Sequence, residues 1–187
     1  MTKRLIEPIA SEEQLRKCAT EEDLAVVTLF SAEQRRREVL AWRAVVRREL
    51  GGDVKIGYDT FGAPVVDRAD THIGVSHSKD MVAVVISDTP CAIDIEDATR
   101  NFERVIERVT TPVERALSSV SDWSARLWCA KEALYKYHRK GELDFRKDIE
   151  ILGCDDCGQE LEARLTEGQR VKVEIEREGN HIIATIV

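Results

Sequence analysis

The sequence predicts an α+β protein, with helices and antiparallel strands in separate stretches of the chain. Two stretches, residues 32–50 and 122–140, have helix-forming composition and an apolar face. Other stretches alternate apolar and polar residues as half-buried strands do, and the last three follow one another with no helix between them. These strand-like stretches are residues 54–58, 92–96, 160–166, 170–176 and 181–187.

Composition narrows the class of protein. The chain has 187 residues, which suffices for one domain or two small fused lobes. Its net charge of −7 argues against nucleic acid as a partner. No apolar run is as long as a membrane span, and the first residues lack the apolar core of a signal peptide. The five cysteines are an odd number, which favours reduced thiols. We therefore expect a cytoplasmic protein with no membrane contact, and we take it to be a monomer.

The N-terminal third should lead into a long basic helix. Residues 1–30 are predicted as strand-loop-strand or strand-helix-strand, with residues 24–30 the most apolar part. Ser31 can cap the following helix, which should end near Leu50 before two glycines. Its arginines have a plain structural interpretation, a solvated face whose side-chain stems cover apolar surface. They are Arg35, Arg36, Arg37, Arg43, Arg47 and Arg48.

The middle of the chain carries two strands and an acidic pair. Residues 81–86 are continuously apolar, residues 87–90 form a turn, and residues 91–96 should return as the hairpin partner. Asp94 and Glu96 are two positions apart, so their side chains share one face of the strand, with Cα atoms about 6.5 Å apart. At an effective dielectric of 20, two charges at that distance repel by about 2.5 kcal/mol. A half-buried pair of this kind needs a cation or a shared proton to offset the repulsion.

A second stretch supplies a third carboxylate and two ammonium groups. Glu132 and Lys136 are four residues apart on the predicted helix 122–140, and Lys131 lies beside them. Three carboxylates suit Mg²⁺, which takes few protein ligands and keeps waters and phosphates, while lysines suit the phosphates. Together the two stretches indicate Mg²⁺-assisted chemistry on a phosphate ester or anhydride. The alternative is structural: a surface ion pair on the helix and the solvated face of an edge strand.

Three short motifs resemble those of one enzyme family. Residues 92–96 read AIDIE and residues 128–136 read WCAKEALYK. They resemble the signature pair of the 4′-phosphopantetheinyl transferase superfamily, (G/A)-(I/V)-D-x-E followed by (W/F)-x-x-K-E-(A/S)-x-x-K. Residues 75–78, VSHS, resemble the S-H-S block of the Sfp-type branch, which also lies just upstream of a hydrophobic strand. The motifs occur in the family's order, and the resemblance covers about residues 30–150.

The resemblance implies a 4′-phosphopantetheinyl transferase-like fold, with two similar α+β lobes in a pseudo-twofold arrangement and the active site between them. We place the lobes at residues 1–97, the coenzyme A phosphate-binding side, and 98–187, the side of the catalytic helix and C-terminal strands. The implied activity is of the holo-acyl-carrier-protein synthase type. It transfers the 4′-phosphopantetheine arm of coenzyme A to a serine of an apo-acyl or peptidyl carrier protein and releases adenosine 3′,5′-bisphosphate.

The resemblance also implies roles for particular side chains. Asp94, Glu96 and Glu132 would hold Mg²⁺ on the diphosphate. Glu132 would accept the serine proton, and Lys136 would stabilise the departing phosphate. Residues 97–120 resemble the stretch that contacts the carrier protein. Coenzyme A would be bound by Ser76, His77, Lys131, Arg36 and Arg43.

The clearest departure of the sequence from the family pattern lies in residues 61–64. Residues 61–64 read FGAP where the family block is G-K-P, so Ala63 replaces a basic residue that touches the coenzyme. Arg68 or the basic helix could supply that charge. Two other functions stay open: a non-catalytic coenzyme A- or carrier-binding protein, and a Mg²⁺-dependent nucleotide hydrolase. Cys154 and Cys157 have CxxC spacing without a second pair, and we expect an ordinary loop there.

Overall fold

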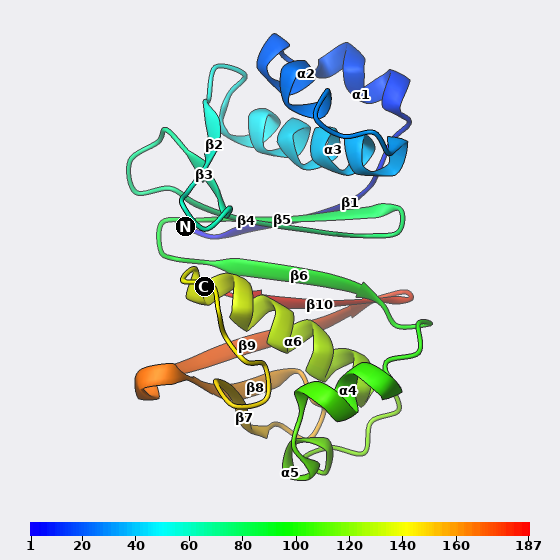
Figure 1. Ribbon diagram of the computed structural model, residues 1–187, viewed down its shortest axis with the longest axis vertical. Helices are drawn as coiled ribbons and strands as arrows, with labels where there is room; N and C mark the ends of the chain where they lie inside the picture. The colour runs from blue at the N-terminus through cyan, green and yellow to red at the C-terminus, as the bar shows by residue number, and fades with distance from the viewer.

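The computed structural model describes the backbone of residues 1–187 and every side chain except that of Glu167. It confirms the α+β class, with two antiparallel sheets stacked in the view of Figure 1 and helices lying against them. Among the helices of the described chain, none is both long enough and apolar enough to cross a membrane. All five cysteines are free thiols.

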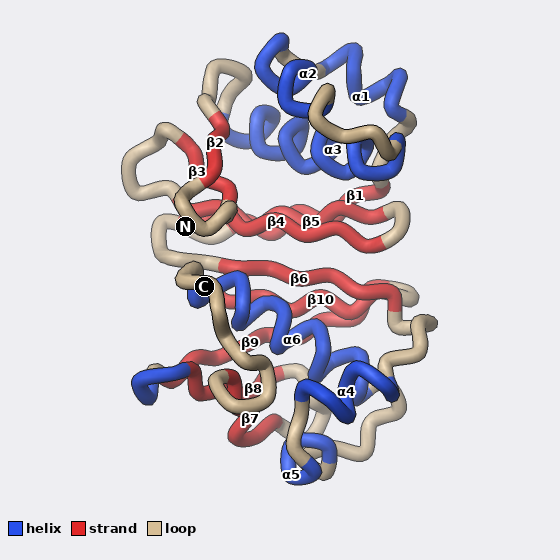
Figure 2. The backbone as a smooth tube through the Cα atoms, in the orientation of Figure 1, coloured by secondary structure: helices blue, strands red, loops and turns tan.

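The N-terminal half places one long helix on a three-stranded sheet. The sheet has the order β1 (Lys3–Pro8), β5 (Met81–Ser87), β4 (His72–Ser78), and both pairs are antiparallel. α3 (Glu33–Leu50) lies on this sheet and ends before Gly51, whose φ of 106° suits glycine. The smaller elements are α1 (Glu12–Cys18), α2 (Glu21–Val27) and a hairpin of β2 (Ile56–Tyr58) and β3 (Pro64–Val66). Figure 2 shows α1, α2 and α3 gathered on the outer side of the sheet.

The C-terminal half places a second long helix on a five-stranded sheet. The sheet contains β6 (Ala92–Asp97), β10 (His181–Ile186), β9 (Arg170–Glu178), β8 (Glu160–Leu165) and β7 (Ile149–Cys154), in that order. α6 (Trp123–His138) lies across it, and its predicted apolar stripe of Trp123, Leu127, Ala130 and Leu134 is buried as expected. The remaining elements are α4 (Glu103–Val109), α5 (Pro112–Arg115) and the 3₁₀ turn η1 (Thr166–Gly168).

The second strand predicted within residues 1–30 is wrong, because that stretch forms α2 and a turn. Thr20 caps the helix: its hydroxyl accepts from the backbone N–H of Asp23, and the Asp23 carboxylate accepts from the Thr20 N–H. Val27 is fully buried in the core cluster that it shares with α3. Of the apolar run only Val27 is buried to this degree, and Leu29, in the turn after α2, is 80% exposed.

The predicted hairpin between residues 81–86 and 91–96 is also wrong. Both edges of β5 are already occupied, one by β1 with Ile6 opposite Ala83 and the other by β4. β6 pairs instead with β10, with Ile95 opposite Ile183. A local hairpin is the default expectation from sequence, whereas the pairing with β10 joins segments that are far apart in the chain.

β4 and β6 hold the two sheets together without a backbone ladder between them. A Cβ on Gly74 of β4 would lie only 3.0 Å from Cα of Ala92 on β6, so the close approach requires glycine. The backbone N–H of Asp97 donates to Ser78 Oγ at 3.0 Å. The edge of β6 that does not pair with β10 is thus held against β4. This contact fixes the position of Asp94 on β6.

The predicted cap at Ser31 is wrong, because α3 begins after Ala32 with no side-chain cap hydrogen bond. α6 likewise begins after Asp122 without one. Thr111 caps α5, with Pro112 at the first position of the helix.

Candidate active site

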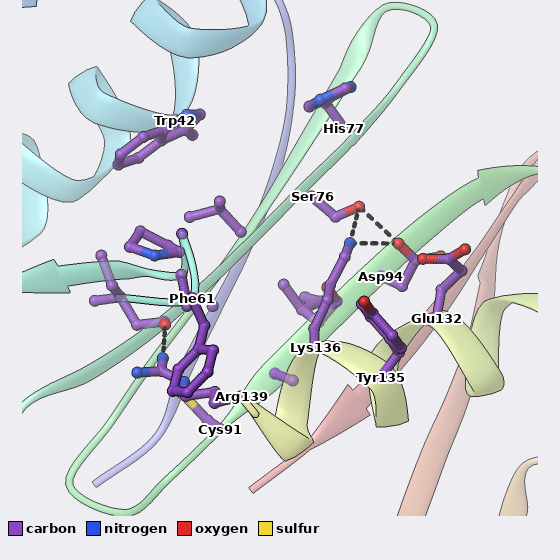
Figure 3. Close-up of a pocket in the computed structure, with 18 of the residues that line it drawn as sticks. Trp42, Phe61, Ser76, His77, Cys91, Asp94, Glu132, Tyr135, Lys136 and Arg139 are labelled. Atoms are coloured by element: carbon purple, nitrogen blue, oxygen red, sulfur yellow. Dashed lines mark hydrogen bonds and ion pairs between the residues drawn. The ribbon is translucent and has the colours of Figure 1, made fainter. Parts of the chain in front are cut away.

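Side chains from both halves of the protein line one cavity of about 480 Å³. Its walls come from α3, the β2–β3 hairpin, β4, β6 and α6. Figure 3 shows Asp94, Glu132 and Lys136 meeting on one side of it, next to Ser76. Six of the residues predicted for the site line this cavity: Ser76, His77, Asp94, Glu96, Glu132 and Lys136.

Asp94, Lys136 and Ser76 form a small polar cluster. Lys136 Nζ donates to Asp94 Oδ1 at 2.6 Å and to Ser76 Oγ at 2.9 Å. Ser76 Oγ also donates to Asp94 Oδ1 at 2.8 Å. Asp94 is only 4% exposed, yet its Oδ2 has no hydrogen-bond partner among the described residues. A buried polar atom without a partner is costly. The other such side-chain atoms among the described residues are Arg43 Nη1 and Thr185 Oγ1, so Asp94 Oδ2 is the one carboxylate oxygen of this kind.

Glu96 and Glu132 carry raised pKa values. Burial raises the pKa of Glu132 to about 7, and the negative charges of Asp94 and Glu96 add to the effect. Burial and the charge of Asp94 likewise raise the pKa of Glu96. Glu96 is held by Trp128, whose Nε1–H donates to Oε1 at 2.7 Å, and by an ion pair with Arg100. The three carboxylates therefore influence one another electrostatically across the cavity wall.

The carboxylates of Asp94, Glu96 and Glu132 supply oxygen ligands of the type that a divalent cation such as Mg²⁺ binds. Asp94 Oδ2 is buried without a hydrogen-bond partner among the described residues. A bound cation would offset the negative charges of Asp94 and Glu96, which add to the effect of burial on the pKa of Glu132. Within the part of the chain whose side chains are described, no three acidic, histidine or cysteine side chains already form a ligand group. Asp94 Oδ1 takes Lys136 instead and Glu96 takes Arg100. The carboxylates would thus have to exchange these cationic partners to bind the ion together.

His77 and Ser76 occupy successive positions of β4. His77 Nε2 accepts from Arg35 at 2.6 Å and lies 3.3 Å from Glu38 Oε2. Burial lowers the pKa of His77, and Arg35 acts in the same direction, while Glu38 opposes both. A neutral imidazole is the form that accepts a hydrogen bond from Arg35.

Lys131 lies outside the cavity, contrary to the expectation that it helps to bind coenzyme A. It is fully buried and pairs with Glu114 Oε1 at 2.7 Å. It also donates to the carbonyls of Phe145 and Ile149 at 2.8 and 2.6 Å. All three of its donors are used within the fold, so Lys131 fastens α6 to α5 and to the start of β7.

The arginines of α3 also have partners inside the fold. Arg43 is fully buried and pairs with Asp23 Oδ1 at 2.5 Å. Arg36 forms a two-pronged contact with Glu12 at 3.0 and 3.1 Å. Neither side chain lines the cavity, so we exclude both from the proposed coenzyme site. Arg68, the suggested replacement for a basic residue at position 63, pairs with Asp53 outside the cavity.

Several cavity residues were not predicted from the sequence. Arg35 belongs to the basic helix but was not singled out there, and it alone of those arginines lines the cavity. Trp42 and Arg139 had no local signal, because their position depends on how α3 and α6 face each other. Tyr58 and Phe61 are about half exposed or more, at 49% and 61%, which is typical of residues at the mouth of a site.

The fold and this cavity define an α+β protein whose two halves share a cavity lined by carboxylate, ammonium and guanidinium groups. Residues 90–186 match the sequence model of the 4′-phosphopantetheinyl transferase superfamily, just over half of the chain. The chain belongs to this superfamily and is accordingly a phosphopantetheinyl-group transferase. The matched segment contains β6 and α6, and therefore Asp94, Glu96, Glu132 and Lys136. No curated protein matches the chain at a significant level.

Proposed function

We propose that this protein is of the Sfp type and transfers the 4′-phosphopantetheine arm of coenzyme A to a serine of an acyl or peptidyl carrier protein. The observation that supports this most is the meeting of Asp94, Glu132 and Lys136 at one cavity between the two halves. In this proposal the N-terminal half, which ends before β6, binds the donor's phosphates. The C-terminal half begins with β6 at Ala92, rather than at residue 98, and carries the catalytic helix. The reaction is cytoplasmic and the enzyme acts as a monomer.

The cavity side chains divide the work of donor binding. Ser76 and His77 lie on β4 beside Arg35, where hydroxyl, imidazole and guanidinium groups can bind phosphate oxygens. Asp94, Glu96 and Glu132 would hold Mg²⁺, which neutralises charge on the diphosphate when it is bound. Lys136, whose present partner Asp94 would be one of those ligands, would be available to donate to a phosphate.

The transfer breaks one phosphorus–oxygen bond and forms another. The serine oxygen of the carrier attacks the phosphorus that bears the pantetheine arm, and the bond from that phosphorus to the bridging oxygen breaks. The bridging oxygen leaves on adenosine 3′,5′-bisphosphate, and Lys136 stabilises its charge. Glu132 accepts the serine proton, because its carboxylate lies at the cavity wall one helical turn from Lys136.

The decisive experiment is mass spectrometry of an apo-carrier protein after incubation with coenzyme A and Mg²⁺. We expect the carrier to gain the mass of one phosphopantetheine arm. Glu132→Gln should lower the transfer rate by at least about a hundredfold while the fold is retained, since loss of a positioned base costs that much or more. Glu13→Gln, which changes an exposed carboxylate on α1, is the matched control and should leave the rate unchanged.

The same measurement separates the other functions. Cleavage of coenzyme A without a modified carrier would identify a hydrolase. Binding of coenzyme A with neither cleavage nor transfer would identify a non-catalytic binding protein. Transfer by Glu132→Gln at the rate of the unaltered enzyme would overturn the role given to this residue.

A further inference from the structure

We propose that Arg139, at the C-terminal end of α6, binds a phosphate group of the donor inside the cavity. This inference rests on the proposed function, because it assumes that the donor is a phosphate-bearing nucleotide such as coenzyme A. It adds a specificity-determining side chain on the part of the cavity near Phe61, away from His77 (Figure 3).

The position of Arg139 favours ligand contact. Its side chain lines the cavity, and Nη2 donates to the carbonyl of Ile73 on β4 at 2.9 Å. This one hydrogen bond holds the guanidinium at the wall of the cavity. A guanidinium has five N–H donors, so most of its hydrogen-bonding capacity is available to a ligand. A planar fork of donors suits the oxygens of a phosphate.

The charge balance of the cavity sets Arg139 apart from the other basic side chains. Arg35 and His77 lie beside Glu38 at 3.2 and 3.3 Å, and Lys136 pairs with Asp94. No described carboxylate lies within 4.0 Å of the Arg139 guanidinium, which is the limit for an ion pair. A cationic group beside a cavity without an anionic partner of its own is suited to an anionic ligand.

The backbone supports the same conclusion. Arg139 has φ 53° and ψ 18°, the left-handed conformation that glycine and asparagine adopt most easily. The helix could end here with glycine at lower conformational cost. A large side chain retained at such a position next to a cavity motivates a functional hypothesis. The competing explanation is structural: a positive charge at a helix C-terminus and a tether to β4.

Calorimetric titration of coenzyme A into the full-length protein and its variants tests the proposal. We expect Arg139→Gln to weaken binding by about tenfold, the usual effect of losing one charged hydrogen bond to phosphate. Arg139→Lys should recover part of the loss because it keeps the charge. Lys140→Gln is the matched control, since Lys140 is exposed on the next position and does not line the cavity.

Two further measurements separate phosphate binding from a tether. Affinity for coenzyme A should fall more steeply with salt concentration in the unaltered protein than in Arg139→Gln, whereas loss of a tether leaves this slope unchanged. Titration of dephospho-coenzyme A then identifies the phosphate. If the variant's loss disappears with this ligand, Arg139 binds the 3′-phosphate, and if the loss persists, Arg139 binds the diphosphate.

Arg139→Gly is a second variant that should fold even if Arg139→Gln does not, because glycine adopts the left-handed backbone at this position without strain. We expect it to melt no lower than the unaltered protein and yet to bind coenzyme A about tenfold more weakly. Equal affinity in Arg139→Gln and the unaltered protein would overturn the inference and leave the proposed function intact. Failure of the unaltered protein to bind coenzyme A would overturn both.

Discussion

Two aspartates, one in each half of the protein, are almost equally buried but differ in how fully their oxygens are used. Asp23 on α2 is 2% exposed and Asp94 on β6 is 4% exposed. Asp23 pairs with Arg43 and Arg47, while Asp94 pairs with Lys136. Both oxygens of Asp23 accept hydrogen bonds, whereas among the described groups Oδ2 of Asp94 has no donor.

This difference indicates that the ion pairs of Asp23 stabilise the fold, whereas the ion pair of Asp94 lies where a ligand can replace one partner. Burial alone would raise the pKa of Asp23, but hydrogen bonds from Arg47, Arg43 and Thr20 outweigh it and hold the pKa below its usual range. A carboxylate so fully used has no acceptor site left for a ligand. Asp94 lies beside the cavity with one buried oxygen that has no donor, at a cost that a bound cation would offset.

The largest effect on stability is expected from breaking the buried cluster of Asp23, Arg43 and Arg47. Asp23→Asn removes the charge that compensates Arg43 and Arg47, and loss of one partner of a buried pair costs about 3–5 kcal/mol. We expect the free energy of unfolding, measured by urea denaturation, to fall by that amount. Glu22→Gln is a sharp control, because Glu22 contacts the same two arginines but is 47% exposed. Its loss should cost less than about 1 kcal/mol.

An equal cost for the two substitutions would contradict this interpretation. It would mean that the cluster is stabilised by total charge rather than by the saturated contacts of Asp23. The role of Asp94 would then have to be judged without this comparison.

The residues of the site were easier to predict than the residues of the structural clusters. Asp94 and Glu96 alternate with buried isoleucines, and Glu132 and Lys136 are spaced one helical turn apart, so local periodicity already places each pair on one face. The prediction that Lys131 binds coenzyme A is wrong, although its position in the sequence already indicates a buried residue. It is four residues from Leu127 and three from Leu134, and therefore lies within the buried stripe of α6.

Contacts between distant segments could not be predicted in the same way. The pairing of Arg43 depends on Asp23, which approaches it only because Glu21–Val27 form a helix rather than a strand. The pairing of β6 with β10 depends on β1 occupying the free edge of β5. Both outcomes are decided by competition for partners across the whole chain, and no local pattern records them.

The carboxylates that line the cavity should also affect how the free energy of unfolding depends on pH. The pKa of Glu132 is raised in the folded protein to about 7, so the folded state holds this proton more tightly than the unfolded state. The stabilisation is complete below the unfolded pKa near 4.5 and is lost as the pH rises through 7. We expect Glu132 to lower the free energy of unfolding by up to about 3 kcal/mol between pH 5 and 8.

Urea denaturation at several pH values, in the presence of a chelator, measures this effect. Glu132→Gln cannot lose a proton, so its free energy of unfolding should fall less with rising pH and exceed that of the unaltered protein at pH 8. Glu13→Gln should follow the unaltered protein at every pH, because Glu13 is 81% exposed. Parallel curves for Glu132→Gln and the unaltered protein would show that Glu132 has an ordinary pKa.

The smallest effect on stability is expected from Asp94→Asn, the same substitution that should be so costly at Asp23. The amide keeps the shape of the side chain and can still accept from Ser76, while Lys136 retains Ser76 and the Ile93 carbonyl and is 34% exposed. Loss of its ion pair is partly balanced by relief of repulsion with Glu132 and Glu96. The free energy of unfolding without metal should therefore change by no more than about 1 kcal/mol.

The rise in melting temperature on addition of Mg²⁺ provides the second readout for Asp94→Asn. A cation that binds only the folded state raises the melting temperature, and the rise should be present in the unaltered protein and lost in the variant. Thr185→Ser controls for changes near β6, because Thr185 lies on the neighbouring strand β10 and its buried hydroxyl has no partner among the described residues. This variant should keep the rise in melting temperature. If the free energy of unfolding of Asp94→Asn instead fell by several kcal/mol, Asp94 would be a structural carboxylate like Asp23.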